Sequence, residues 1–228
     1  MKETIYTIPV NEVFEPKDGC PLCRLRDILE ERSLEYIMGA AMMELDVRTE
    51  SNKTGFCQTH YLGMLARRNR LSLTLILESH LAEQKKNLAA ANAAYGKKKA
   101  ANTGLDRCFV CEQIDWALTR MIETVCKSWA KEEDFRKLYA EQPYICLTHY
   151  HALASRAGKF LGRKELAPFL NETLRLTEKK LDDVAADVSA FCKLFDYRSV
   201  GSKPTPEVAA AAERAIHYIT SRDPQIEK

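Results

Sequence analysis

Residues 20–23 read Cys-Pro-Leu-Cys and residues 57–60 read Cys-Gln-Thr-His, a C-x-x-C motif followed by a C-x-x-H motif. The pair returns as Cys-Phe-Val-Cys at 108–111 and Cys-Leu-Thr-His at 146–149. The gap between the two motifs is 34 positions in the first copy and 35 in the second, and the copies are offset by 88 to 89 positions. The sequence therefore predicts two tandem repeats.

The repeat extends beyond these motifs, because Tyr follows the His in both copies and Arg67 falls opposite Arg156. An Ala- and Lys-rich stretch separates the copies and is typical of a linker. We predict a first repeat at 1–90, a linker at 91–105, a second repeat at 106–198 and a C-terminal helix packing on the repeats at 199–228.

The composition favours an all-α fold. Of the 228 residues, 46% are hydrophobic, enough for a sizeable core, whereas 9 Gly and 8 Pro argue against a loop-rich or many-stranded chain. Apolar side chains recur at helical spacing over 111–129 and 173–195. Thr205 followed by Pro206 predicts the start of the last helix. Only residues 5–10 have strand-like alternation.

Charge and hydropathy exclude several classes of partner. The formal net charge is +2, so no overall field favours nucleic acid or a membrane surface. No apolar run approaches the ~20 residues of a membrane helix, and the first 16 residues lack the apolar core of a signal peptide. We expect a cytoplasmic chain, where thiols stay reduced and closely spaced cysteines are typically metal ligands or redox groups.

The two motif pairs supply two Cys3His sets, the usual donor chemistry of structural zinc. We predict two zinc ions per chain, with an iron–sulfur cluster as the alternative. A redox dithiol leaves the C-x-x-H motifs unexplained, and His151 is a weaker candidate because Leu62 is its counterpart. The predicted metal ligands are Cys20, Cys23, Cys57, His60, Cys108, Cys111, Cys146 and His149.

The path of the chain constrains how these ligands meet. In the second repeat, a helix over 111–129 and a shorter helix over 131–142 can return the chain to Cys146. In the first repeat, a helix reaching about residue 45 requires 46–56 to return largely extended. Both paths close, so we expect each repeat to be a helical hairpin clasped by one metal. An exchange of ligand pairs between the repeats stays open.

The remaining reactive side chains have simpler interpretations. Cys126 and Cys192 lie beside apolar stripes, which predicts buried core thiols. His80 and His217 flank apolar helical faces and are expected to be packed or on the surface. The Arg67-Arg68-Arg70 group is interpreted as supporting the metal ligands or lying on the surface, with binding of an anion or nucleic acid as the alternative. No nucleophile elbow, P-loop or dinucleotide motif is present, so we predict no catalytic residue.

The motifs together resemble a family of uncharacterised bacterial proteins, a domain of unknown function with paired Cys and His motifs. The resemblance rests on Cys-Pro-Leu-Cys-Arg-Leu at 20–25, Gly-Phe-Cys-x-x-His at 55–60, the second motif pair, Phe-Asp-Tyr-Arg at 195–198 and Glu-Arg-Ala at 213–215. It spans nearly the whole chain. It implies a bacterial, cytoplasmic, helical protein and no particular activity.

Two closed donor sets without a catalytic motif predict a zinc-binding, non-enzymatic structural or interaction module with a protein partner. The alternative is a redox or metal sensor, in which thiolate oxidation releases the metal. A third hypothesis is an enzyme that keeps an open coordination position on one metal.

Overall fold

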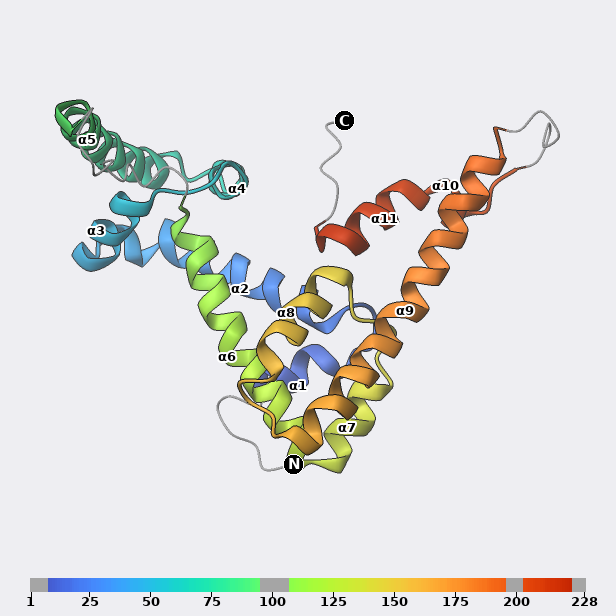
Figure 1. Ribbon diagram of the computed structural model, residues 1–228. Coiled ribbons are helices and arrows are strands. Elements are labelled where there is room, and N and C mark those ends of the chain that lie inside the picture. Colours follow the sequence, from blue (N-terminus) through green and yellow to red (C-terminus); the bar gives the residue numbers. More distant parts are fainter. Residues whose placement is uncertain (1–7, 95–106, 196–202, 223–228) are drawn as a thin grey trace. The chain divides into compact units, whose positions relative to one another are not determined.

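The computed structural model describes residues 8–94, 107–195 and 203–222, and helices dominate all three ranges, which contain no strand (Figure 1). This confirms the all-α fold. The elements are α1 (Ile8–Phe14), α2 (Pro21–Met38), the 3-10 helix η1 (Ala40–Met43), α3 (Leu45–Thr54), α4 (Gln58–Ala66), α5 (Arg70–Ala94), α6 (Phe109–Lys131), α7 (Glu133–Ala140), α8 (Leu147–Ala157), α9 (Arg163–Lys193), α10 (Pro206–Ala209) and α11 (Ala211–Thr220).

The chain divides into two compact units that are not consecutive in sequence. The first unit combines residues 1–25 with 119–228, and the second contains residues 26–118. Helices α2 and α6 each contribute residues to both units. The division therefore takes the Cys20–Cys23 motif out of the first repeat and groups it with the end of the second.

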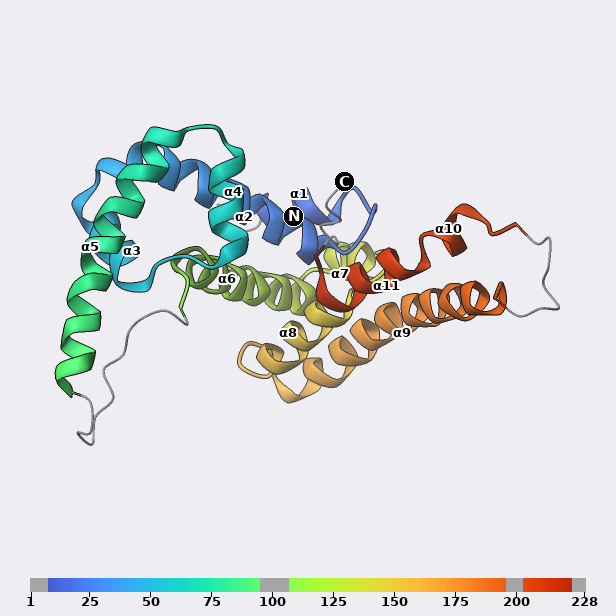
Figure 2. The ribbon, with the colours of Figure 1, turned by 90° about the horizontal axis from the view of Figure 1, so that it is seen from above.

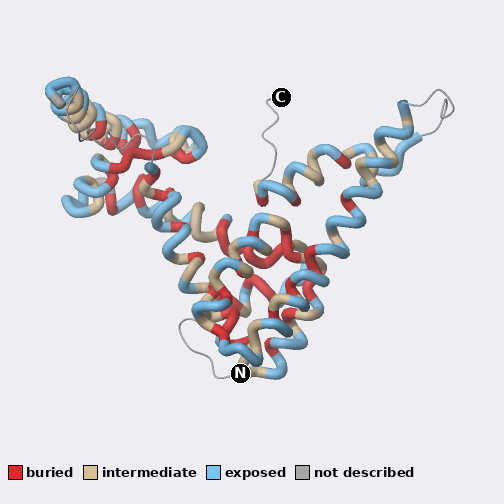
Figure 3. The backbone as a smooth tube through the Cα atoms, in the orientation of Figure 1, coloured by how far each residue is buried: buried red, intermediate tan, exposed pale blue. Residues whose placement is uncertain are grey.

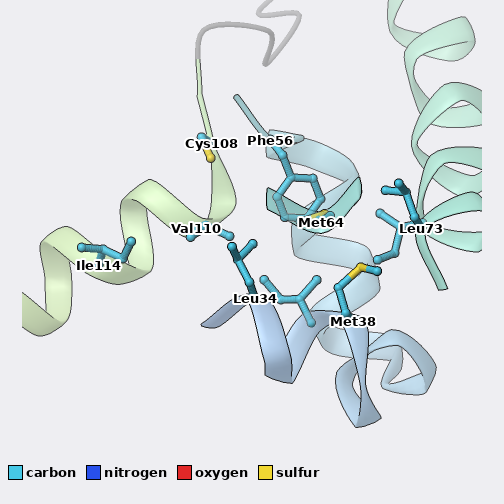
Figure 4. Close-up of a cluster of buried hydrophobic side chains, with 10 residues drawn as sticks. Leu34, Met38, Phe56, Met64, Leu73, Cys108, Val110 and Ile114 are labelled. Atoms are coloured by element: carbon cyan, nitrogen blue, oxygen red, sulfur yellow. The ribbon is translucent and has the colours of Figure 1, made fainter. Parts of the chain in front are cut away.

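The second unit is built around one apolar cluster (Figure 4). Helix α3 packs on α5, and the two lie side by side in Figures 1 and 2. The buried cluster consists of Leu34, Ile37, Met38, Phe56, Met64, Leu73, Ile76, Cys108, Val110 and Ile114. Side chains from α2, α4, α5 and α6 thus meet in one core, which fixes the start of α4 against the start of α6.

The predicted extended return over 46–56 is wrong, because residues 45–54 form α3. Helix α2 also ends earlier than expected, at Met38. The extended path was required only if both motifs of the first repeat had to bind the same metal. Without that requirement, a stretch that lacks Gly and Pro up to Gly55 is free to be helical.

The first unit has an aromatic core. The ring of Phe14 lies 5.3 Å from Phe135 and 5.8 Å from Tyr139, and Tyr139 lies 5.4 Å from Phe169, measured between ring centroids. The Tyr139 hydroxyl lies 2.8 Å from Oγ1 of Thr173, so its one polar atom is hydrogen-bonded. Buried and exposed positions alternate along α9, as expected for an amphipathic helix (Figure 3).

The C-terminal helices pack on this core. Helix α11 contacts both α8 and α9 and runs beside α9 in Figures 1 and 2. The buried Tyr218 donates from its hydroxyl to the carbonyl of Thr177, 2.7 Å away. The predicted start is confirmed, because the Thr205 side chain accepts from Val208 N–H and Pro206 begins α10, but the helix is interrupted at Ala210.

Three further expectations can be compared with the fold. The strand-like residues 5–10 lie partly outside the described residues, and from Ile8 onward they form α1. Cys126 is fully buried, as predicted, whereas Cys192 is exposed, so its assignment to the core is wrong. Most of the predicted linker lies outside the described residues, and the predicted domain boundaries remain a prediction.

No described helix is both long and apolar enough to cross a lipid bilayer.

Candidate metal centres

The structure gathers the eight predicted ligands into two clusters. The first cluster contains Cys20, Cys23, Cys146 and His149, and the second contains Cys57, His60, Cys108 and Cys111. In each cluster, the four candidate ligand atoms all lie within 4.8 Å of one another. Both clusters have Cys3His composition, and each lies entirely within one compact unit.

In the first cluster the sulfur and nitrogen atoms are in direct contact. Nδ1 of His149 lies 3.7 Å from Sγ of Cys20, 3.4 Å from Sγ of Cys23 and 3.1 Å from Sγ of Cys146. The Sγ atoms of Cys23 and Cys146 are 3.5 Å apart. All four residues are buried.

The second cluster repeats this geometry. Nδ1 of His60 lies 3.1 Å from Sγ of both Cys57 and Cys108 and 3.6 Å from Sγ of Cys111. The Sγ atoms of Cys57 and Cys111 are 4.0 Å apart. His60 and Cys108 are buried, Cys57 is half-buried and Cys111 is exposed.

These separations fit one tetrahedral metal ion per cluster. With Zn–S bonds of ~2.3 Å and Zn–N bonds of ~2.0 Å, tetrahedral coordination places neighbouring ligand atoms roughly 3.5–3.8 Å apart. The individual distances given above, 3.1 to 4.0 Å, bracket that range. In both clusters Nδ1 of the imidazole faces the sulfurs, which leaves Nε2 directed away from them.

The motifs combine between the repeats and not within one repeat. The C-x-x-C motif of the first repeat meets the C-x-x-H motif of the second, and the converse holds for the other cluster. The expected hairpin clasped by its own metal is therefore wrong, and the exchange left open by the sequence is what the fold adopts. The physical reason is packing, since the cluster of Figure 4 brings the start of α6 beside the start of α4.

Helix N-termini present the ligands. Cys57 and Cys146 are the N-cap residues of α4 and α8, with extended backbones and no side-chain capping bond, so each sulfur is available to a metal. As predicted, the His three positions later lies on the same face of the helix. The positive end of a helix dipole favours thiolate over thiol.

Backbone hydrogen bonds shape the C-x-x-C motifs. The N–H groups of Cys23 and Arg24 both donate to the carbonyl of Cys20, which folds the motif tightly at the start of α2. In the second cluster, the N–H of Phe109 donates to the carbonyl of Gly55 over 2.9 Å. This bond ties the segment before Cys57 directly to the segment that carries Cys108.

The contacts within the clusters shift the pKa values of the thiols in opposite directions. Burial opposes ionisation of Cys20, but hydrogen bonds from Cys146, Cys23 and His149 hold its pKa well below the usual value. Burial likewise opposes ionisation of Cys108, and the hydrogen bond to His60 nevertheless lowers the pKa of Cys108 to about 6.

The pKa values of Cys111, Cys146 and Cys23 are raised. Burial and the neighbouring Cys108 raise the pKa of Cys111 to about 12, and a hydrogen bond to Cys20 contributes to a pKa of about 12 for Cys146. Hydrogen bonds to Cys146 and Cys20 raise the pKa of Cys23 as well. A metal that binds three thiolates must therefore displace protons from the clusters.

A carboxylate lies behind the second cluster. Oε1 of Glu30 on α2 is 3.0 Å from Nε2 of the fully buried His60. Carboxylates that contact the outer nitrogen of a ligating imidazole fix its tautomer and raise its basicity. Sequence reasoning missed Glu30, although its position two helical turns after Cys23 is a signal that could have found it. Its counterpart in the second repeat is the apolar, buried Leu118.

The other candidates lie outside both clusters. His151 is exposed and belongs to neither cluster. Nδ1 of His80 lies 3.0 Å from the carbonyl of Asn52, so His80 is a packed residue of the second unit. Arg67 forms an ion pair with Glu31, with Nη2 and Oε2 2.5 Å apart, which agrees with a surface role.

An all-α chain with two Cys3His clusters at helix N-termini defines the class, a helical protein with two groups positioned to hold a metal ion. The chain belongs to a family of unknown function, DUF6062, whose model matches residues 1–226. Searches of curated proteins and of solved structures found no match.

Proposed function

We propose that the chain binds two zinc ions, one in each cluster, and that these ions hold its helices in place. The carrying observation is the donor set: four protein atoms per cluster at tetrahedral spacing. Cys3His is a usual set for structural zinc, and an ion with four protein ligands keeps no position for water or substrate. This favours a structural role over hydrolytic or redox catalysis at the metal.

The short distances between the ligand atoms fit a single zinc ion better than an iron–sulfur cluster. The clusters bring sulfur and nitrogen atoms as close as 3.1 Å. That spacing accommodates a single ion, whereas ligands of a multinuclear cluster bind different iron atoms and lie farther apart.

We further propose that the folded chain is a non-enzymatic structural or interaction module of the cytoplasm, with a protein as its partner. Reduced, metal-binding thiols suit a compartment in which disulfides do not persist. The near-neutral net charge of +2 disfavours nucleic acid as the partner.

Metal analysis of the purified protein tests the proposal. We expect two zinc atoms per chain and no visible absorption band from iron and sulfide. Cys57→Ser should retain one zinc atom and destabilise the second unit, because the ligand set of that unit loses one of its four donors. Cys192→Ser is the matched control, an exposed thiol outside both clusters, and should keep both zinc atoms. Unchanged zinc content and stability in Cys57→Ser would show that the proposal is wrong.

A further inference from the structure

The two clusters differ in how exposed their cysteine residues are. In the first cluster Cys20, Cys23 and Cys146 are at most 5% exposed. In the second cluster Cys108 is buried, but Cys57 is half-buried and Cys111 is exposed. These two more exposed cysteines are neighbours, with Sγ atoms 4.0 Å apart. The second cluster therefore has a solvent-facing edge made of two thiols and a buried edge made of Cys108 and His60.

The first cluster is also more fully covered by neighbouring helices than the second. Helix α8, which carries two ligands of the first cluster, packs against both α9 and α11. Oγ1 of Thr148, between those ligands, donates to the carbonyl of Ile219 over 2.7 Å. The ring of Tyr144 packs beside Tyr218, with centroids 6.1 Å apart. The C-terminal helix thus covers the first cluster and fixes its ligands.

Aromatic side chains line the buried side of the second cluster. The rings of Phe56 and Tyr61 lie 5.5 Å apart, and those of Phe56 and Phe109 lie 6.3 Å apart. Phe56 belongs to the buried core, with Tyr61 and Phe109 packed against it. Together with Glu30 against His60, these contacts hold the buried edge of the cluster and leave the Cys57–Cys111 edge accessible.

We propose that the second cluster is a peroxide-sensitive metal site: hydroperoxides oxidise Cys57 and Cys111 to a disulfide, and the metal leaves, while the first cluster keeps its metal. The inference rests on the proposed function, because it requires both clusters to hold zinc. It names the oxidant class and the pair of sulfurs that react.

The reaction balances in two steps. The Cys111 thiolate attacks one oxygen of the hydroperoxide, the O–O bond breaks, and a sulfenic acid and an alkoxide or hydroxide ion form. The Cys57 thiolate then attacks the sulfur of Cys111, the S–S bond forms and hydroxide leaves. The hydroperoxide gains two electrons from the two thiolates. The disulfide takes Cys57 and Cys111 out of the set of residues that would hold the metal, and Cys108 and His60 remain as a buried half-site.

The experiment uses the full chain loaded with zinc and carrying Cys192→Ser, which removes an exposed thiol outside the clusters. Limiting hydrogen peroxide is added, released zinc is followed with a chromogenic chelator, and alkylated peptides are identified by mass spectrometry. We expect one of the two zinc atoms to leave at least about tenfold faster than the other, because oxidation follows thiolate exposure. The faster loss should coincide with a Cys57–Cys111 disulfide, and a thiol reductant with zinc should restore the site.

The outcomes separate the inference from the function on which it rests. Fewer than two zinc atoms before peroxide is added contradicts the proposed function, and the inference with it. Two zinc atoms lost at equal rates, earlier loss from the first cluster, or a disulfide that does not join Cys57 to Cys111 overturns the inference alone. In those cases the structural zinc sites still stand.

Discussion

At the scale of single residues, Gly55 determines how the chain enters the second cluster. Its φ of 65° and ψ of −160° place it in a region that side chains other than glycine rarely adopt. A Cβ atom at this position would lie 2.8 Å from Cε1 of His80. Its carbonyl accepts the hydrogen bond from Phe109 N–H, so this glycine conformation links both motifs of the cluster.

Gly55→Ala should therefore lower the free energy of unfolding by about 1–3 kcal/mol. The added methyl group opposes the backbone angle and collides with the imidazole of His80. Urea unfolding of the zinc-loaded protein measures the change. The matched control is Gly158→Ala, where φ is −62° and the nearest atom to an added Cβ is 3.8 Å away. Equal effects of the two substitutions would contradict the role given to Gly55.

The two cysteines outside the clusters should differ in reactivity. Burial raises the pKa of Cys126 to about 12, whereas Cys192 is exposed. Near pH 8.5, roughly a thousandth or less of Cys126 is thiolate, and that fraction grows only as the pH rises towards 12. Of the two cysteines outside the clusters, iodoacetamide should modify only Cys192 in the zinc-loaded chain, and Cys192→Ser should abolish that modification. Rapid labelling of Cys126 in the same variant would disprove its burial.

At the scale of elements, the short helix α1 depends on packing. It has seven residues, too few for independent stability. Its last residue, Phe14, is fully buried between Phe135 and Tyr139, and its carbonyl accepts from Nε2 of Gln142 over 2.8 Å. One aromatic ring and one hydrogen bond thus fix the helix to α7 and the residues that follow it.

Phe14→Ala should cost about 3–5 kcal/mol of unfolding free energy, because it leaves a cavity among aromatic rings that are already fixed. Ile8→Ala on the same helix is the matched control. Ile8 is 44% exposed, so its truncation should change stability by less than about 0.5 kcal/mol. Thermal unfolding of both variants provides the measurement, and a small effect at Phe14 would refute this account of α1.

The sequence was sufficient for most helices because their signals are local. The periodicity over 111–129 and the cap at Thr205 depend on neighbouring residues only, and both were confirmed. Cys192 shows the limit of such signals. An amphipathic stripe predicts which face of α9 is apolar, but not how far along the helix a partner covers it. The helix over 45–54 was missed because we assumed that both motifs of the first repeat bind the same metal. That assumption required an extended chain where the local sequence favours a helix.

At the scale of the whole molecule, the pairing of the motifs follows the two compact units, because each cluster lies within one of them. Spacing identified all eight cluster residues, yet each repeat alone offers a chemically complete Cys3His set. Only packing of the helices between distant segments distinguishes exchange from self-closure. That information is distributed over the core in Figure 4 and not contained in any motif.

Paired substitutions test the exchange directly. Cys23→Ser with Cys146→Ser removes two ligands from one cluster and should leave one zinc atom per chain. Cys23→Ser with Cys57→Ser removes one ligand from each cluster and should leave none tightly bound. Pairing within each repeat requires the reverse result for both double variants. Zinc content after gel filtration in the presence of a competing chelator measures the difference.

Because of the exchange, the loop of chain closed by one cluster lies within the loop closed by the other. The second cluster closes the 48-residue separation from His60 to Cys108, and the first closes the 123-residue separation from Cys23 to Cys146 around it. Once the second cluster has formed, the loop that the first cluster must close contains only the flanking stretches of 34 and 35 positions. Each doubling of loop length raises the free energy of loop closure by about 0.6 kcal/mol. Formation of the second cluster should therefore lower the cost of closing the first by somewhat less than that. An unfolded chain should therefore bind its first ion at the second cluster and its second ion at the first cluster. The binding should show weak positive cooperativity, which two adjacent, separate hairpins would lack.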